Sequence, residues 1–597
     1  MPELQFKGKE FVYNHHLTVP FRPLVPDAER SCGDDRDNLI IQGDNLHALK
    51  SLLPRYAGAV DLVFIDPPYN TGNEGWAYND NVNSPLLREW LDGNPVNTED
   101  MLRHDKWLCM MWPRLKLLHE LLSEQGSIWI TLDDNEMHHA RAMLDEIFGA
   151  ENFVATCIWQ KNFSPKNTAQ QFSQDHDFVL VYAKQAATWV PKLLPRTPEM
   201  EARYSNQDSD PRGPWMSSDL SARNYYGEGT YSITTPAGRL IEGPPSGMYW
   251  RVKESKFFEL DRDKRIWWGE DRNNQPRIKR FLSEVKDGRV PQTLWFYDEV
   301  GHTQDAKKEL LRILNFASSD DVFVTPKPTA LIERILELGA GEDAIVLDSF
   351  AGSGTTAQAV LAQNAKDGGN RKFILVECEA YADSLTAERV RRVIQGYPYT
   401  GSQREELFSE KLTMRSLLDA PKLLEKVALI EQQQASRFDR IKRTVKDGEL
   451  KLIGEREVQE RAEGLGGGFT FCTLGEPIEL DGLLQGRNLP SFEAFGSYLF
   501  HTATGQVLDP ERVDAHTGYL GESAHYHVWL IYRPELEFLK SRDAALNLAT
   551  AERIRAFDAG MRHLVFAPAR YVPQRKLLEL GVEHAPLPYA LYRIERS

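Results

Sequence analysis

Two segments constrain the fold of this chain most strongly, because each is a short apolar run that ends in a specialised turn. The first is Val60 to Tyr69, with the sequence VDLVFIDPPY, and the second is Val346 to Thr356, with the sequence VLDSFAGSGTT. Apolar runs of this length, bounded by turn residues, are typical of strands buried on both faces of a parallel sheet. The chain is therefore expected to contain an α/β fold.

Alternation of strand and helix patterns surrounds both segments. In the first half, strands are expected at 38–42, 61–65, 127–132 and 177–182, with helices at 46–53 and 137–147. In the second half, helices are expected at 307–314, 327–338, 356–363 and up to about 395, with strands at 344–347 and 372–376. These patterns predict one α/β domain in two halves, residues 38–184 and 300–400, preceded by an N-terminal extension, residues 1–37.

Two further regions lack this alternation. Residues 185–299 are rich in Pro, Gly, Asn and Ser, which predicts a loop-rich domain inserted between the two halves. Residues 401–597 are expected to form a separate α+β domain with a role in assembly. Within it, an amphipathic helix is predicted from Leu423 to Val445. This helix is either a contact surface for a second copy or another subunit, or a helix packed within its own domain.

The glycine-containing turn has the features of a cofactor site. A strand ends at Asp348, and Gly352 and Gly354 then allow the backbone to come close to a ligand at the start of a helix. No Gly-Lys-Ser/Thr follows, which excludes a nucleoside-triphosphate loop. The next predicted strand ends at Glu377, where an acidic side chain can bind ribose hydroxyls. The pattern predicts an adenosine-containing cofactor.

The Asp66-Pro-Pro-Tyr69 turn has the features of a base-binding loop. The carboxylate of Asp66 and the carbonyl of Pro67 are both hydrogen-bond acceptors, and the two prolines make the turn rigid. Two acceptors can bind the two hydrogens of an exocyclic amine and so orient its lone pair. Tyr69 offers a ring on which a flat base can stack. Asp-Pro-Pro is also a common turn former, but its place at the end of a buried strand favours the functional interpretation.

Charge is distributed unevenly along the chain. The net charge is −16, whereas residues 151–300 contain 21 Lys and Arg against 20 Asp and Glu, a net of +1. The inserted region also combines basic and aromatic residues, a combination that suits contacts with phosphates and bases. We expect DNA-binding residues here, namely Arg262, Lys264, Arg265, Trp267, Trp268, Arg277, Lys279 and Arg280.

Other classes of protein are disfavoured. The five cysteines are scattered, without Cys or His partners at metal-ligand spacing, so neither a metal site nor a disulfide framework is expected. No apolar run approaches the roughly 20 residues that span a bilayer, and the amino terminus lacks the pattern of a signal peptide. A cytoplasmic protein without membrane contacts is expected.

In the order of its motifs, the chain resembles the β class of amino-group DNA methyltransferases, and most closely the modification subunits of type III restriction-modification systems. The resemblance covers about residues 39–395. It is carried by Gln42-Gly-Asp-Asn45, Asp66-Pro-Pro-Tyr69, Gly301-His-Thr303, Thr325-Pro-Lys-Pro328, Asp348-Ser-Phe-Ala-Gly-Ser-Gly-Thr-Thr356 and Gly368-Gly-Asn-Arg371. One departure is Ser349, where the family pattern has proline.

The resemblance implies a permuted S-adenosylmethionine-dependent methyltransferase domain that is interrupted by a target recognition domain. It implies double-stranded DNA as substrate, adenine N6 as the methyl acceptor, and a homodimer or a restriction or other defence-system subunit as partner. The implied catalytic residues are Asp66, Pro67 and Tyr69. The implied cofactor-binding residues are Asp44, Lys327, Asp348, Phe350, Gly352, Gly354 and Glu377.

Several alternatives stay open at this point. Asp44 is also suited to be a helix cap, and Lys327 to be an exposed lysine in the first turn of a helix. The acceptor could be cytosine N4 instead of adenine N6, because the same two acceptor groups suit either amine. The chain could also be a DNA-binding specificity subunit that binds cofactor without turnover.

Overall fold

The computed structural model describes residues 3–33, 37–71, 102–166, 168–314, 325–411, 420–446, 449–478, 489–523 and 525–587. The chain divides into two compact units. One unit comprises Met1–Val190 together with Gln292–Ser597, and the other comprises Pro191–Pro291. Within the described residues, no helix is long and apolar enough to cross a membrane.

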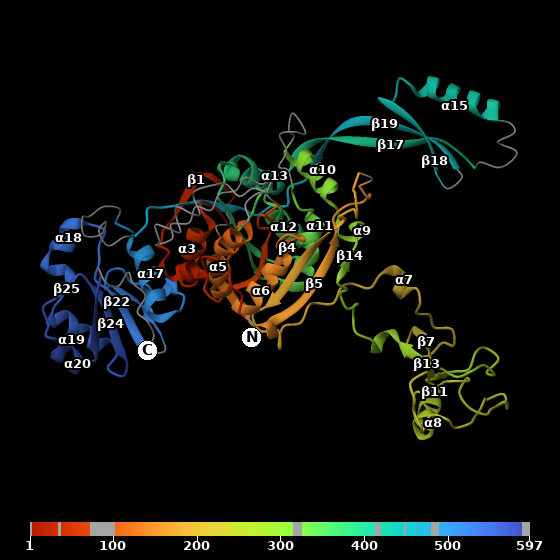
Figure 1. Cartoon of the computed structure of the whole chain (residues 1–597), viewed down its shortest axis with the longest axis horizontal. Helices are drawn as coiled ribbons and strands as arrows, with labels where there is room; N and C mark the ends of the chain where they lie inside the picture. Colours follow the sequence, from red (N-terminus) through yellow and green to blue (C-terminus); the bar gives the residue numbers. More distant parts are fainter. Residues whose placement is uncertain are drawn as a thin grey trace. The chain divides into compact units, whose positions relative to one another are not determined.

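A ten-stranded sheet, counted over the described residues, forms the centre of the larger unit (Figure 1). Its spatial order is β1-β20-β2-β16-β15-β3-β4-β6-β5-β14. The five central strands are β2 (Leu39–Gln42), β16 (Lys372–Glu377), β15 (Ile345–Asp348), β3 (Val60–Ile65) and β4 (Leu122–Leu132). All four pairings among them are parallel. The predicted α/β class is therefore confirmed.

The two predicted halves interleave in this sheet. Strands β15 and β16 come from the second half of the sequence, yet they lie between β2 and β3 from the first half. The pairing of β15 with β3 places Val346 opposite Leu62 and Leu347 opposite Val63. This is a Rossmann-like sheet in which the order of the two halves is permuted along the chain.

Helices cover both faces of the central strands, because these strands are apolar on both sides. One layer contains α3 (Asn45–Tyr56), α5 (Arg103–Leu121) and α6 (Met137–Phe148), whose apolar residues share a core with Val63 and Ile65. On the opposite face lies α11 (Thr329–Gly339), where Gly339 lies beside Leu62 and Trp129. The strand residues alternate between the two layers, as the two-residue period of a strand requires.

The strands at one edge of the sheet come from segments outside the two predicted halves. Strand β1 (Leu24–Cys32) comes from the extension, and β20 (Phe469–Leu474) comes from the region assigned to the C-terminal domain. Strand β20 pairs in parallel with β2 and antiparallel with β1. A domain boundary at residue 401 therefore does not separate the sheet from everything that follows. The apolar sequence of β20 predicts a strand but does not indicate which sheet the strand joins.

On the other side, β6 (His176–Ala183) is antiparallel to β4, β5 (Phe153–Gln160) is antiparallel to β6, and β14 (Leu294–Trp295) is parallel to β5. The last of these strands lies within the range predicted for the insertion. The compact insertion is consequently shorter than 185–299, because Gln292 and the residues after it belong to the larger unit.

The predicted helix from Leu423 to Val445 is wrong in its second half. Helix α15 ends at Gln434, and Arg440–Lys446 forms strand β18 beside β19 (Glu449–Ala462), which also pairs with β17 (Tyr397–Lys411). Ile441 and Val445 fit a strand as well as a helix, because β-branched residues favour strands. Leu423 and Val427 of α15 pack against Leu450 and Leu452 of β19, so part of the apolar face of the helix is covered by its own sheet (Figure 1).

The last two described segments form a four-stranded sheet, in the order β21 (Tyr519–Glu522), β22 (Tyr526–Leu530), β24 (Arg562–Ala567) and β26 (Val582–Pro586). The last three strands are parallel to one another. Helices α17 (Phe492–Thr504), α19 (Leu548–Phe557) and α20 (Gln574–Glu579) contribute to its apolar cores.

The smaller unit, Pro191–Pro291, contains little regular structure, as predicted from its composition. A three-stranded sheet joins β12 (Ile266–Trp267), β13 (Arg277–Phe281) and β7 (Trp215–Asp219), and α8 (Glu254–Arg262) covers a small core. Two pairs of two-residue strands complete it. They are β9 (Ile233–Thr234) with β10 (Leu240–Ile241), and β8 (Ser221–Ala222) with β11 (Tyr249–Trp250).

Asn38 is a buried tie between the central sheet and β20. Its Nδ2 donates to the carbonyl of Gly468 at 2.9 Å, and its Oδ1 accepts from the backbone N–H of Phe373 at 2.8 Å. We predict that Asn38→Ala lowers the free energy of unfolding by roughly 2–4 kcal/mol, because both backbone groups stay buried without these bonds. Chemical denaturation of the larger unit measures this. The exposed Asn14 of the same unit supplies a control, since Asn14→Ala should change stability by less than about 0.5 kcal/mol.

Candidate active site

The predicted catalytic and cofactor loops lie at the same edge of the sheet. Parallel strands β2, β16, β15 and β3 end at Gln42, Glu377, Asp348 and Ile65, and each is followed by one of the predicted motifs. Ligands of α/β proteins bind at the carboxyl ends of such strands. The strands that carry the glycine turn and the Asp66 turn are immediate neighbours, so a ligand at this edge can contact both loops.

Asp66 is held from two sides. Its Oδ1 accepts a hydrogen bond from the Thr131 hydroxyl of β4 at 2.6 Å, and its Oδ2 forms an ion pair with Lys327 Nζ. Lys327 stands just before α11 and is buried. The ion pair joins the two halves of the sequence at the site. The interpretation of Lys327 as an exposed lysine is therefore wrong.

The two proline carbonyls of the turn have different surroundings. The carbonyl of Pro68 accepts a hydrogen bond from Trp107 Nε1 at 2.7 Å, which fixes the turn against α5. Among the described residues, none donates to the carbonyl of Pro67. Pro67 therefore keeps the acceptor that the sequence predicted for a bound amine.

Tyr69 is fixed by its hydroxyl. The hydroxyl donates to Asp177 Oδ2 at 3.3 Å, and Asp177 Oδ1 accepts from Lys161 Nζ at 2.6 Å. Burial, followed by the nearby charges of Asp66 and Asp177, raises the pKa of Tyr69 well above its ordinary value. The phenol therefore stays protonated at neutral pH and remains a donor. Lys327 Nζ lies 5.0 Å from the ring centroid, within the range of a cation–π contact.

The glycine turn is stabilised from within the protein. Asp348 is buried, and its two oxygens accept from the N–H of Phe350 at 3.0 Å and from the Thr356 hydroxyl at 2.5 Å. Gly352 and Gly354 have φ angles of 50° and 78°, in the left-handed region that favours glycine. A Cβ on Gly354 would lie 3.0 Å from the Thr386 carbonyl oxygen. Both glycines are thus required by local geometry, and Asp348 shapes the turn.

Glu377 connects the end of β16 to this turn. Its Oε2 accepts from the N–H of Gly352 at 2.7 Å, and its Oε1 accepts from the N–H of Glu379 at 3.0 Å. Burial raises the pKa of Glu377, and the two backbone bonds oppose that change. A carboxylate offers about four acceptor positions, so these two backbone bonds alone do not saturate Glu377.

Asp44 caps α3, as one of the two interpretations predicted. Its Oδ1 accepts from the N–H groups of Leu46 at 2.8 Å and His47 at 3.4 Å. Among the described residues, none bonds to its Oδ2, so the cap leaves one oxygen for a ligand. Next to it, Asn45 bridges the two halves of the chain: Nδ2 donates to the Ser349 carbonyl at 2.9 Å, and Oδ1 accepts from Arg114 Nε at 2.5 Å.

The predicted DNA-binding residues fall into two groups. Trp268 is buried in the core of the smaller unit, and Lys279 is buried and ion-paired with Asp208 and Asp210, so these two predictions of surface contacts are wrong. Sequence alone hid the burial because Lys279 stands next to the exposed Arg280 in β13, and Trp268 next to the half-buried Trp267 just after β12. The others are exposed or half-buried, namely Arg262, Lys264, Arg265, Trp267, Arg277 and Arg280.

Some of the exposed cations form salt bridges within the smaller unit, and others do not. Arg265 pairs with Asp263 and Glu284, and Arg277 pairs with Asp219 at 2.9 Å. Among the described residues, Arg262, Lys264 and Arg280 have no such carboxylate partner. Their charges are the ones most available to an anionic ligand.

Sequence reasoning missed several residues that support the site. Thr131, Asp177 and Lys161 lie on β4, β6 and just after β5, and each reaches the Asp66 turn through space. Arg389 is fully buried and donates to the hydroxyls of Ser353 at 2.9 Å and Thr355 at 2.8 Å. No local motif marks any of these residues, although Thr131 does stand near the end of an obvious strand.

The fold and the site define a Rossmann-like domain with a cofactor turn and an Asp-Pro-Pro-Tyr turn at one edge of the sheet. The model of the N6/N4 methyltransferase family, described as a DNA methylase, matches residues 60–388, more than half of the chain. The chain belongs to this DNA methylase family. The resemblance predicted from the motifs is confirmed.

Individual relatives agree with this assignment. The StyLTI Mod subunit of a type III restriction-modification enzyme from Salmonella typhimurium is 35% identical over 393 residues, which are 62% of this chain and 58% of the relative. The EcoPI Mod subunit of Escherichia phage P1 is 30% identical over 395 residues, 57% of each chain. The type II methyltransferase M.KpnI of Klebsiella pneumoniae is 30% identical over 366 residues, 58% of this chain and 81% of the relative. The matches span less than two thirds of either Mod subunit.

The buried Asp348 predicts a pH dependence of stability. Burial raises its pKa to about 7, whereas an aspartate in the unfolded chain titrates near about 3.9. The unfolded chain thus releases this proton at lower pH than the folded protein does, so stability falls as pH rises from about 4 to 7. The expected loss is roughly 4 kcal/mol at most.

Asp348→Asn should remove this part of the pH dependence, because an amide keeps an acceptor for Phe350 N–H and can donate to the Thr356 hydroxyl. Urea denaturation of both proteins at several pH values between 4 and 8 measures it. An identical fall of stability in the variant would show that Asp348 is already ionised at low pH in the folded protein.

Proposed function

We propose that the chain is a site-specific DNA methyltransferase that transfers a methyl group from S-adenosylmethionine to the N6 amine of a flipped-out adenine. We further infer that it serves as the modification subunit of a restriction-modification system, as its relatives of the Mod type are named. The observation that carries the proposal is the adjacency of β3 and β15, which puts the Asp66 turn beside the glycine turn.

The residues at the edge of the sheet suit an adenosine-containing cofactor. Glu377 is a buried carboxylate at the end of β16 that can accept from ribose hydroxyls, and Asp44 Oδ2 can accept from an adenine amine. Phe350 is half-buried in the same turn and offers an apolar ring. Bound S-adenosylmethionine supplies an electrophilic methyl group on a positively charged sulfur. The carboxylates at this edge favour that charge.

Asp66 and Pro67 would hold the target amine. The two amine hydrogens donate to the Asp66 carboxylate and the Pro67 carbonyl, which directs the nitrogen lone pair away from both acceptors and toward the methyl group. Asp66 also stands where the proton released from the nitrogen can be taken up. Because the methyl group is already electrophilic, alignment of the amine provides most of the rate enhancement.

Lys327 has to share Asp66 with the substrate. Its ammonium occupies Asp66 Oδ2 in the free protein, so an incoming amine competes with it for the same oxygen. The ammonium can move to an anionic group of the cofactor, such as the carboxylate of its methionine part. Lys327 would then couple cofactor binding to the release of the catalytic carboxylate.

Tyr69 would compensate for the cost of flipping the base. Rotating a nucleotide out of the duplex costs a few kcal/mol of stacking and pairing, and stacking on an aromatic ring returns roughly 1–3 kcal/mol. The bond from the Tyr69 hydroxyl to Asp177 holds the ring in place before the base arrives. The site is thus prepared for a planar ligand.

Reaction of the purified chain with methyl-labelled S-adenosylmethionine and duplex DNA tests the proposal directly. After digestion to nucleosides, chromatography separates N6-methyladenine from N4-methylcytosine and unmodified bases. Label in N6-methyladenine supports the proposal, and label in N4-methylcytosine would identify the cytosine enzyme instead. Cofactor and DNA binding without transfer would identify a specificity subunit.

Asp66→Ala is predicted to reduce methyl transfer by roughly 1000-fold or more, because the amine loses its charged acceptor. Asp66→Asn keeps one acceptor oxygen and should retain part of the activity. Cofactor binding, measured by calorimetry, should persist in both variants, because Lys327 then has no strong ion pair with residue 66 to give up. Asp134→Ala, an exposed aspartate after the adjacent strand, is the matched control. Full activity of Asp66→Ala would remove this carboxylate from the reaction.

The smaller unit is proposed to bind the DNA, with Arg262, Lys264 and Arg280 as phosphate contacts. Each neutralised phosphate contributes roughly 0.9 to the slope of log affinity against log salt concentration. Replacing all three by alanine should therefore lower the slope by up to about 3 and weaken binding to all sequences alike.

Fluorescence anisotropy at several salt concentrations measures this slope. Arg553, an exposed arginine in α19 of the larger unit with no carboxylate partner among the described residues, provides the matched control. An unchanged slope in the triple variant would mean that other cations contact the phosphates.

A further inference from the structure

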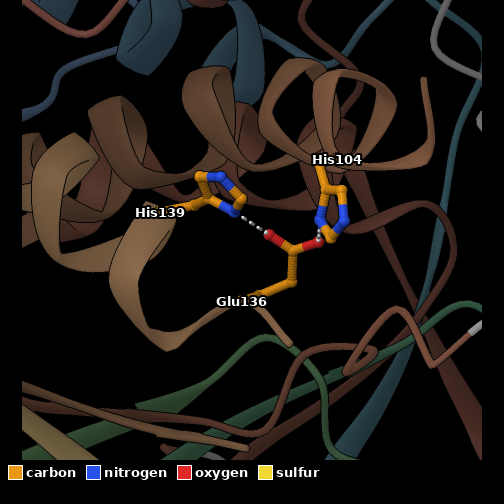
Figure 2. Close-up of side chains that lie close together, drawn as sticks. All are labelled: His104, Glu136 and His139. Atoms are coloured by element: carbon orange, nitrogen blue, oxygen red, sulfur yellow. Dashed lines mark hydrogen bonds and ion pairs between the residues drawn. The ribbon is translucent and has the colours of Figure 1, made fainter. Parts of the chain in front are cut away.

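His104, Glu136 and His139 form a cluster (Figure 2), and a hydrogen bond from Asn70, the residue after Tyr69, joins it to the catalytic turn. His104 lies in the first turn of α5, Glu136 is the residue before α6, and His139 lies in the first turn of α6. His104 Nδ1 lies 2.6 Å from Glu136 Oε1, and His139 Nδ1 lies 3.0 Å from Oε2. Both imidazoles point toward the Glu136 carboxylate that lies between them (Figure 2), and no residue of this cluster takes part in the proposed methyl transfer.

We propose that these three side chains bind a divalent transition metal, with zinc as the best match. Two imidazole nitrogens and one carboxylate oxygen are a known zinc ligand set, which leaves a fourth position for water. One ligand atom from each residue lies within 4.8 Å of the other two. Tetrahedral coordination at about 2.0 Å separates ligand atoms by roughly 3.3 Å, so small side-chain rotations suffice.

The exposure of the three side chains suits a metal site, which needs fixed ligands and a path for the ion to enter. The Glu136 side chain is fully buried, whereas those of His104 and His139 are 31% and 28% exposed. The carboxylate is thus fixed inside, while solvent reaches the imidazoles and gives the ion a path to the site. Neither imidazole needs a proton on Nδ1 when a metal replaces the hydrogen bonds to the carboxylate.

Asn70 supplies an outer partner and a link to the catalytic turn. It directly follows Tyr69, and its Nδ2 donates to Glu136 Oε1 and to the Arg103 carbonyl at 3.1 Å. Its φ of 60° is unusual for a residue other than glycine. A bound ion would fix the carboxylate that holds Asn70, and so would fix the exit of the Asp66 turn against the start of α5 and α6.

Zinc affinity of the purified full-length chain tests the proposal, measured in competition with a chromophoric chelator after complete removal of metal. One zinc ion per chain should bind, and His104→Ala and His139→Ala should each weaken it by more than the roughly 10–100-fold typical of losing an outer partner. His516→Ala is the control, since this histidine is exposed and lies outside the cluster. Absence of tight binding, or equal weakening by the control, would overturn the proposal.

Two further measurements do not depend on variants that have lost a ligand. Cobalt(II) bound to the unaltered chain should give the visible absorption of a four-coordinate nitrogen and oxygen site. Absorption typical of thiolate ligation would place the ion at the cysteines and contradict the proposal. Asn70→Gly keeps the backbone conformation and removes only the amide donor, so zinc should bind roughly 10-fold more weakly. An unchanged affinity in Asn70→Gly would contradict the outer-partner role of Asn70.

Discussion

The parallel pairing of β15 with β3 is the constraint on which the site depends. Val346 and Leu347 align with Leu62 and Val63, although the two strands are more than 280 positions apart in the chain. Because the strands are parallel and in contact, their carboxyl ends emerge at one edge. A shift to antiparallel pairing, or to opposite ends of the sheet, would separate the Asp66 turn from the glycine turn and leave neither with a partner.

Side chains from other strands and from helix α5 then hold this edge in a fixed geometry. Thr131 positions Asp66 from the neighbouring strand, Asp177 positions Tyr69, and Trp107 fixes the second proline carbonyl. Each of these partners is itself buried or part of a buried element, so its position is determined by packing. The entropic cost of orienting the acceptors is therefore met when the protein folds, which is the condition for catalysis by alignment.

Most of the central fold could be predicted from the sequence, and the limits have physical causes. The strands at 61–65 and 372–376 and the helix after Pro328 followed from apolar patterns and proline placement, which are local signals. The edge strand β20 could not be predicted as part of this sheet, because pairing between remote strands leaves no local trace. The predicted helix after Gln434 failed because β-branched residues at its apolar positions suit a strand equally well.

The candidate site shows the same division. The residues of the two motifs are where the sequence placed them, since the motif includes the strand that positions it. Lys279 and Trp268 were misplaced because burial in a loop-rich unit depends on contacts across the chain. The ion pair of Lys327 with Asp66 could not be predicted either, since it joins residues 261 positions apart.

An accumulation of buried carboxylates gives the edge of the sheet its electrostatic character. Burial raises the pKa of Asp348, of Glu377 and of Asp177, which means that each ionised form is disfavoured where it stands. Lys327 and Lys161 offset part of this negative charge near Asp66 and Asp177. A ligand with a positive centre would stabilise the ionised carboxylates further, so its binding would lower their pKa values and release protons. The fold thus creates, at the ends of its parallel strands, an environment that favours a cationic cofactor before any specific contact with it is made.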